Sequence, residues 1–290
     1  MEANSFEEYI LKKGHTKETV KTYSFEVTPF IAMFPDMHTF TFKQVHQALT
    51  EYLKHHKNQN YKNSILAAIK KYYDYLIETG QRNDHPCRTM QFKAVRNNKV
   101  IHSDLFSAAE LELLMEREER FPMLRLRNQV IVSLLIYQAL QIQELENLKV
   151  QHINLDEGKV YVQATPSGKR RHLDLHPRQY KIFDSYINES RRELLKIESD
   201  KLIVGTRGTP ITKDQVHYII STFKPLFPDR NLTPEAIRQS VIANWINERR
   251  FPLEQVQLMA GHAWISTTEK YRQTSADDRR AIVNRFHPLA

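Results

Sequence analysis

One short alternating segment, enclosed on both sides by helical periodicity, limits the fold more than any other feature of this chain. Residues 159–163 and 171–175 each alternate apolar and polar side chains, and Thr165-Pro166-Ser167-Gly168 between them is a turn sequence. A period of two is typical of a half-buried strand, so the segment predicts a β-hairpin. Most of the remaining chain repeats apolar residues at helical spacing. We therefore predict a mainly α fold with a small β-sheet (α+β).

The first ninety residues contain only helical patterns. Four helices are predicted, beginning near Ser5, Thr16, Phe42 and Tyr61, and Gly80 ends the fourth as a C-cap residue. The fourth helix places its apolar residues on one side and three lysines elsewhere, Lys62, Lys70 and Lys71. A lysine row beside a packed helix lies either on a solvated face or against DNA, and the pattern alone leaves both open.

Residues 81–105 interrupt the helical pattern and indicate a boundary between domains. The stretch is weakly apolar, and its basic residues Lys93, Arg96 and Lys99 could follow a phosphate backbone. We predict a helical domain at residues 1–90, a basic linker at 91–106 and a second domain at 107–290.

The second domain shows several local signals. Ser107 and Glu110 have the spacing of a capping box, and the apolar run at 124–139 predicts a long helix. Residues 202–204 predict a third short strand. Thr233 followed by Pro234 predicts the N-cap and first residue of another helix.

The charge balance suits a polyanionic partner. The formal net charge is +8, and residues 1–100 hold 15 Lys and Arg against 10 Asp and Glu. A surplus of this size also serves solubility, so it does not decide between the two. Cys87 is the single cysteine, which excludes an internal disulfide and fits a reducing compartment. No signal pattern and no apolar run of roughly 18 residues is present. We expect a soluble, cytoplasmic protein without a membrane partner.

One box in the second domain combines several residue types at fixed offsets. Residues 255–262 read Gln-Val-Gln-Leu-Met-Ala-Gly-His, and Ser266-Thr267-Thr268-Glu269-Lys270-Tyr271 follows, with Tyr271 nine residues after His262. The box resembles the Leu-Gly-His … Ser-Thr-Thr-x-x-Tyr box of the tyrosine recombinases (phage-integrase type). Residues 135–148 and 232–240 resemble two further motifs of that family. Residues 1–88 resemble its helical core-binding domain, and 107–290 its catalytic domain.

The resemblance implies a covalent reaction on duplex DNA. In the family a tyrosine oxygen attacks a phosphodiester and keeps a 3′-phosphotyrosyl link, which a 5′-hydroxyl later resolves without ATP, metal or cofactor. Two arginines and one or two histidines neutralise the transition state, and a hairpin lysine protonates the leaving oxygen. The two domains would clamp the duplex, mainly through phosphate contacts.

Carried over residue by residue, the resemblance is incomplete. It makes Tyr271 the nucleophile, Arg238 the second arginine and His262 the later histidine. The first arginine falls on Gln141, the first histidine on Glu235, the second helix histidine on Gln239 and the hairpin lysine near Thr165. Lys169 stands four residues on and could replace that lysine, and Arg170 and Arg171 beside it are predicted DNA contacts.

Three functions are compatible with these observations. The first is a recombinase that cuts and rejoins DNA, such as one that integrates a mobile element. The second is a catalytically inactive DNA-binding regulator on the same scaffold, a repressor or an accessory factor. Either would act as a homo-oligomer on DNA or beside an active recombinase. The third, a helical scaffold protein without DNA, is disfavoured by the basic surplus of the first hundred residues.

Overall fold

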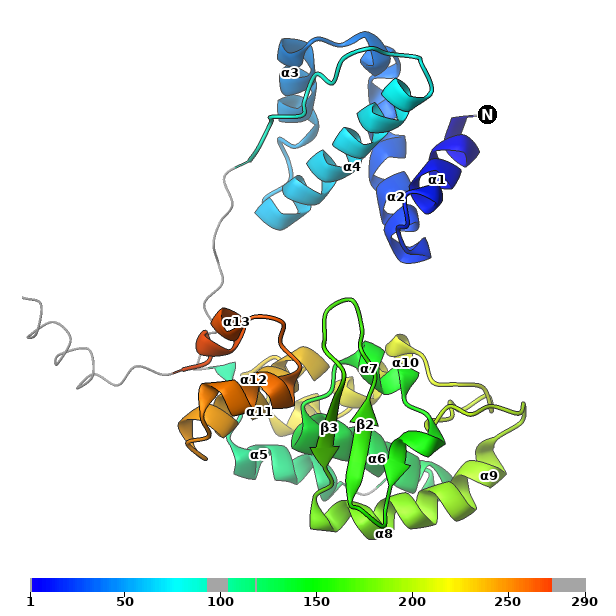
Figure 1. Cartoon of the computed structure of the whole chain (residues 1–290), viewed down its shortest axis with the longest axis vertical. Helices are drawn as coiled ribbons and strands as arrows, with labels where there is room; N and C mark the ends of the chain where they lie inside the picture. Colours follow the sequence, from blue (N-terminus) through cyan, green and yellow to red (C-terminus); the bar gives the residue numbers. More distant parts are fainter. Residues whose placement is uncertain (1, 93–103, 118, 273–290) are drawn as a thin grey trace, which may run out of the picture. The chain divides into compact units, whose positions relative to one another are not determined.

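The computed structural model describes residues 2–92, 104–117 and 119–272. The chain divides into two compact units, residues 1–97 and 98–290 (Figure 1). Each unit has its own hydrophobic core. The predicted linker at 91–106 lies mostly outside the described residues.

The N-terminal unit is helical in all its described secondary structure. Its elements are α1 (Glu2–Lys12), α2 (Lys17–Met33), the 3-10 turn η1 (Pro35–Thr39), α3 (Phe42–Tyr52) and α4 (Gln59–Glu78). Thr16 caps α2 by accepting from the Thr19 N–H at 3.3 Å, as its sequence position predicts. Asn58 caps α4, which therefore begins two residues before the predicted start at Tyr61.

Helices α2 and α4 pack against each other and carry much of the N-terminal core. Phe30, Ile65 and Ile69 are fully buried between the helices of this unit. Tyr73 is also buried, and its hydroxyl donates to the Met37 carbonyl at 2.7 Å, so the polar end of this ring is satisfied inside the core. Gly80 follows the end of α4 with a φ of +73°, a conformation that favours glycine.

The C-terminal unit combines short helices with a small sheet. Its helices are α5 (Ala108–Glu112), α6 (Pro122–Gln138), α7 (Ile142–Asn147), α8 (Pro177–Ser185), α9 (Arg191–Leu194), α10 (Lys213–Ser221), α11 (Pro234–Asn247), α12 (Leu253–Ala260) and α13 (Ile265–Glu269). Short turns are η3 (Leu113–Met115), η4 (Val150–His152), the π-helical η5 (Tyr186–Ser190) and η6 (Lys224–Leu226). Both predicted caps are present, the Ser107–Glu110 box of α5 and Thr233 at α11.

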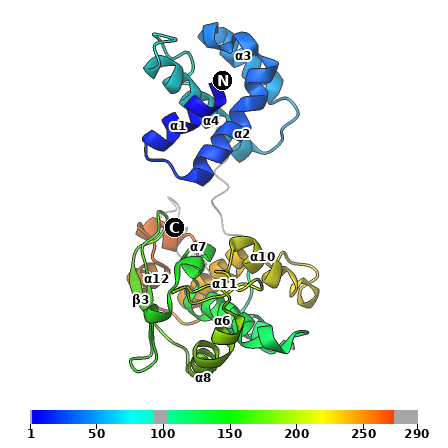
Figure 2. The same cartoon turned by 90° about the vertical axis from the view of Figure 1, so that its right-hand side faces the viewer.

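Helix α6 lies inside the C-terminal unit and packs against α8 and α11 (Figure 2). It is buried around most of its circumference from Val130 to Ile136, as expected for a helix that is apolar on all sides. It ends at Ala139, which adopts a left-handed conformation with φ +51°.

The described strands form one antiparallel sheet in the order β1-β2-β3, from β1 (Ile153–Asn154), β2 (Lys159–Val162) and β3 (Arg171–Asp174). The predicted hairpin is therefore present, with Val160 opposite Leu173. The prediction of a third strand at 202–204 is wrong. That segment makes only isolated bridges at its ends, Lys149–Lys201 and Val204–Pro210, to two different parts of the chain, so no ladder forms. The third strand is β1 instead.

Within residues 2–92, 104–117 and 119–272, no helix has both the length and the apolar character needed to cross a bilayer.

Candidate active site

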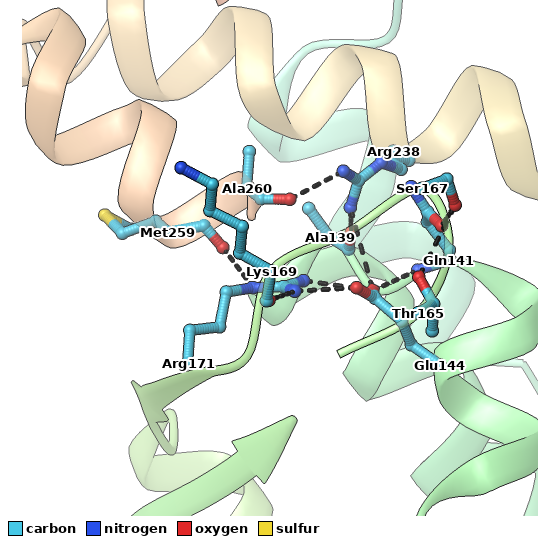
Figure 3. A network of polar contacts seen from close by, with 10 residues as sticks. All are labelled: Ala139, Gln141, Glu144, Thr165, Ser167, Lys169, Arg171, Arg238, Met259 and Ala260. Carbon is cyan, nitrogen blue, oxygen red and sulfur yellow. Dashed lines mark hydrogen bonds and ion pairs between the residues drawn. The ribbon is translucent and has the colours of Figure 1, made fainter. Parts of the chain in front are cut away.

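A buried carboxylate stands at the centre of the candidate site. Glu144, in the first turn of α7, accepts from Arg171 Nη1 at 2.6 Å and Nη2 at 3.0 Å, and from the main-chain N–H of Gln141 at 2.9 Å (Figure 3). Arg238 Nη1 lies 4.0 Å from Glu144 Oε2. We call Glu144, Arg171, Arg238 and Gln141 the Glu144 cluster. It joins α7, the hairpin and α11.

The guanidinium of Arg171 forms its hydrogen bonds with groups inside the protein. Besides its two bonds to Glu144, its Nε donates to the Met259 carbonyl at 2.7 Å and its Nη1 to the Lys169 carbonyl at 3.2 Å. The residue is only 8% exposed. The prediction that Arg171 contacts DNA is therefore corrected. Because it begins β3 on the inward-facing side of the strand, its guanidinium points into the core rather than into solvent.

Gly261, the glycine of the Ala-Gly-His box, makes room for this arginine. Its φ is +71°, and a Cβ at this position would stand 2.4 Å from Arg171 Nη1. Its carbonyl also accepts from the Lys169 N–H at 2.9 Å. The backbone angle and the close approach both require glycine, so the hairpin and the end of α12 fit together only with this residue.

Arg238 projects from α11 and is buried. Its Nη1 donates to the Ala139 carbonyl and its Nη2 to the Ala260 carbonyl at 2.7 Å. Burial lowers the pKa of Arg238, while the Glu144 carboxylate acts in the opposite direction. The two carbonyls lie at the ends of α6 and α12, so Arg238, which belongs to α11, links three helices. Its positive charge lies where these helices meet.

His262 and Tyr271 lie side by side after α12 and α13. Their rings are nearly parallel, with centroids 6.1 Å apart and an interplanar angle of 13°. His262 Nδ1 is 2.9 Å from Thr268 Oγ1, and Asn247 Nδ2 donates to the Tyr271 carbonyl at 2.9 Å. Burial raises the pKa of Tyr271, and the negative charge of Glu235 raises it further.

The pKa of His262 is lowered to about 4, first by burial and then by the positive charges of Arg238 and Arg171. Because the neutral ring is favoured in the folded state, its contribution to stability is complete above the unfolded pKa near 6.5. That contribution is lost as the pH falls from 6.5 towards 4. We expect the loss to reach about 3 kcal/mol of unfolding free energy.

Urea unfolding at several pH values, with His262→Gln as the control, measures this effect. His152 and His176 also have lowered pKa values and change stability in the same direction. The His262 contribution is therefore the difference between wild type and variant. If the two curves run parallel from pH 6.5 to 4, His262 is not the group responsible.

The other positions that the resemblance singles out lie at the start of α7, on the hairpin and on α11. Gln141 is the N-cap residue of α7, and its side-chain Oε1 accepts from Ser167 Oγ at 2.7 Å. Thr165 pairs with Gly168 across the turn, and Lys169 beside it is exposed. Glu235 is exposed in the first turn of α11 and accepts from Gln239 Nε2 at 3.2 Å, so these two side chains pair with each other.

The charges of four side chains in this region cancel one another. Arg171 and Arg238 contribute two positive charges, and Glu144 and Glu235 two negative charges. His262 is neutral at pH 7 because its pKa is about 4. Lys169 and its neighbour Arg170 are exposed cations on the hairpin, and the Lys169 N–H donates to the Gly261 carbonyl.

The other predicted DNA contacts differ in exposure and in pairing. Lys62, Lys70 and Lys71 are half-buried on α4, and Lys71 pairs with Asp74 at 3.3 Å. Arg170 is exposed on the hairpin. Lys93, Arg96 and Lys99 lie outside the described residues.

Sequence reasoning missed Glu144 and Ser167. The signal for Glu144 was its spacing, because Gln141 and Glu144 stand three residues apart at a helix start, as in a capping box. Ser167 read as an ordinary turn residue, and nothing in the sequence connected it to Gln141.

Comparison with known proteins agrees with this geometry. A model of the phage integrase family matches residues 104–278, and the chain therefore belongs to this family of tyrosine recombinases. The tyrosine recombinase XerD of Lacticaseibacillus casei is 25% identical over 285 residues, which cover 96% of this chain and 95% of that protein. XerD of Staphylococcus haemolyticus is 30% identical over 189 residues, covering 64% and 63%.

Solved structures show the same fold. A XerH site-specific recombinase bound to a palindromic difH substrate superposes with a TM-score of 0.72 at 17% identity, over 93% of this chain and 79% of that one. A lambda integrase dimer bound to a COC′ core site gives 0.68 at 17% identity, over 95% and 94%. The family and the predicted fold class are confirmed.

Proposed function

We propose that this chain performs site-specific recombination of duplex DNA, with Tyr271 as the nucleophile. The observation that carries the proposal is that Tyr271 and His262, from one box, lie side by side and within electrostatic range of Arg238, which belongs to the Glu144 cluster. The relatives support it, because they are named as tyrosine recombinases and two of the similar structures hold DNA.

Each of these residues has a role in the proposed reaction. The Tyr271 hydroxyl loses its proton to water as its oxygen forms a bond to phosphorus, the bond from phosphorus to the 5′ oxygen breaks, and the 5′ oxygen leaves with a proton. Arg238 supplies positive charge to the transition state. His262 is neutral, and with the Thr268 hydroxyl on Nδ1 its Nε2 can donate to a phosphate oxygen. Lys169 is the exposed hairpin cation available to protonate the leaving oxygen.

A covalent-adduct assay tests the proposal. Duplexes are first selected from a random pool for binding to the full chain. They are then nicked, so that the short fragment released with a free 5′-hydroxyl diffuses away and cannot rejoin. We expect wild type to form a protein–DNA adduct that survives denaturation, and Tyr271→Phe to form none while binding the same duplex. Bound duplex without adduct in the wild type would overturn autonomous cleavage.

The balance of charge favours a second candidate, an inactive DNA-binding regulator on the recombinase scaffold. Gln141, Glu235 and Thr165 stand where the family resemblance expects cations, and an exposed carboxylate near a phosphate adds repulsion. Such a protein would bind DNA as a homo-oligomer or beside an active recombinase. Adding a catalytically active relative to the adduct assay separates the two candidates, since a regulator changes the partner's yield without forming an adduct itself.

A further inference from the structure

The turn of the hairpin makes one side-chain contact that the proposed reaction has not yet used. Ser167 Oγ donates to Gln141 Oε1 at 2.7 Å, across the space between the hairpin and the start of α7 (Figure 3). Gln141 is the residue at the position where the family resemblance expects the first arginine. The contact therefore involves a side chain that the resemblance places at the reacting phosphate.

The direction of this hydrogen bond decides what Gln141 can offer. An amide has an acceptor end and a donor end, and the oxygens of a phosphodiester only accept. With Ser167 donating to Oε1, the Nε2 end remains for another partner. Within the described part of the chain, Gln141 Nε2 donates to no protein acceptor. A serine hydroxyl at this point favours the one amide orientation that is useful toward a phosphate.

Ser167 is itself held in place. Thr165 and Gly168 exchange two main-chain hydrogen bonds across the turn, at 2.8 and 3.2 Å. A Cβ on Gly168 would lie 2.8 Å from Glu144 Oε1, so any larger residue would force the turn or the Glu144 side chain to shift. Arg171 then ties the hairpin to Glu144 and to the Met259 carbonyl. The turn cannot move away from α7 without breaking these contacts.

Gln141 and Arg238 approach the same carboxylate. The Gln141 main-chain N–H donates to Glu144 Oε2, and Arg238 Nη1 lies 4.0 Å from that oxygen. Arg238 also bonds to the carbonyl of Ala139, two residues before Gln141. An amide with its donor end free therefore lies next to Arg238, the cation that the proposed reaction uses.

We propose that Ser167 is a positioning residue that holds the Gln141 amide so that Nε2 donates to one non-bridging oxygen of the scissile phosphate. The inference rests on the proposed function and deepens it, because it assigns a neutral hydrogen-bond donor to the place of a charged one. Gln141 is then a catalytic residue, and Ser167 acts only through it.

Three variants separate orientation from structure. Ser167→Ala removes the donor to Oε1, and we expect single-turnover cleavage to slow about tenfold, the effect of losing one oriented neutral hydrogen bond. Ser167→Thr keeps a hydroxyl and should stay within about twofold of wild type. Gln141→Glu still accepts from Ser167 but has no donor for the phosphate, and should slow cleavage by about 100-fold or more.

A stereochemical readout distinguishes this role from a general structural one. Methylphosphonates of each configuration are placed in turn at every phosphate in the centre of the selected duplex. Only one non-bridging oxygen accepts from Gln141, so wild type should bind and cleave one diastereomer better at the scissile position. In Ser167→Ala this preference should shrink about tenfold. A preference and a rate equal to those of wild type would overturn the proposal.

The binding half of this experiment does not depend on cleavage. If wild type binds the duplex without forming an adduct, the proposed function fails, and the affinities for the two diastereomers still decide the role of Ser167. Unfolding curves of each variant verify that the C-terminal unit is intact.

Discussion

Replacing Arg171 by methionine is expected to lower the unfolding free energy of the C-terminal unit by about 3–5 kcal/mol, because it leaves the Glu144 carboxylate buried without its main partner. Four hydrogen bonds of the guanidinium are lost at once, including those to the Met259 and Lys169 carbonyls. For a unit of this size, the fall in Tm is on the order of 10 °C.

Both tryptophans, Trp245 and Trp264, belong to the C-terminal unit, so selectively excited tryptophan fluorescence during urea unfolding reports on that unit. Arg178→Met is the matched control, since Arg178 pairs with Glu112 at 2.9 Å while remaining largely exposed. It should cost less than about 1 kcal/mol. Equal losses for the two variants would show that the Glu144–Arg171 pair is not a buried, structurally required interaction.

Restoring charge at two positions is expected to raise the rate of strand cleavage about 100-fold or more. The variant combines Gln141→Arg with Glu235→His. The first change supplies a charged, forked donor beside Arg238, and arginine meets two phosphate oxygens at once. The second removes a carboxylate whose charge raises the pKa of Tyr271. Single-turnover adduct formation on the selected duplex measures the gain.

Added positive charge alone also tightens DNA binding, so this gain needs its own control. Gln143→Arg serves, because Gln143 is exposed on the same helix and two residues from Gln141. It should tighten binding at low salt without changing the cleavage rate of bound DNA. A double variant that binds more tightly and cleaves no faster than wild type would contradict the electrostatic account.

Local signals predicted most of the fold because their physical causes are local. Thr16, Ser107 and Thr233 each cap a helix, and each is recognisable from the residues that follow it. The hairpin was predictable from its period of two. Residues 202–204 misled because buried apolar runs look alike, whether they pair in a ladder or, as here, in isolated bridges.

The candidate site was only half predictable, for a different reason. The box from Gly261 to Tyr271 carries its spacing within one short segment. The Glu144 cluster instead depends on contacts between α7, the hairpin and α11, whose residues are far apart in sequence. Arg171 shows the difference. In the sequence Arg171 belongs to a basic run on a hairpin, which is typical of an exposed residue. It is buried because it pairs with Glu144, which lies 27 residues earlier in the chain.

The position of Glu144 also bears on how the chain acquires its structure during synthesis. A nascent chain extended as far as β3 already holds the carboxylate and Arg171, and lacks Arg238 and the carbonyls of Met259 and Ala260. These later partners close long loops, which form slowly. Until they arrive, the α6–hairpin portion exposes an apolar face that α11 will cover, and such intermediates are prone to associate. The last quarter of the chain thus completes both the C-terminal core and the reactive group, so a prematurely ended product lacks both.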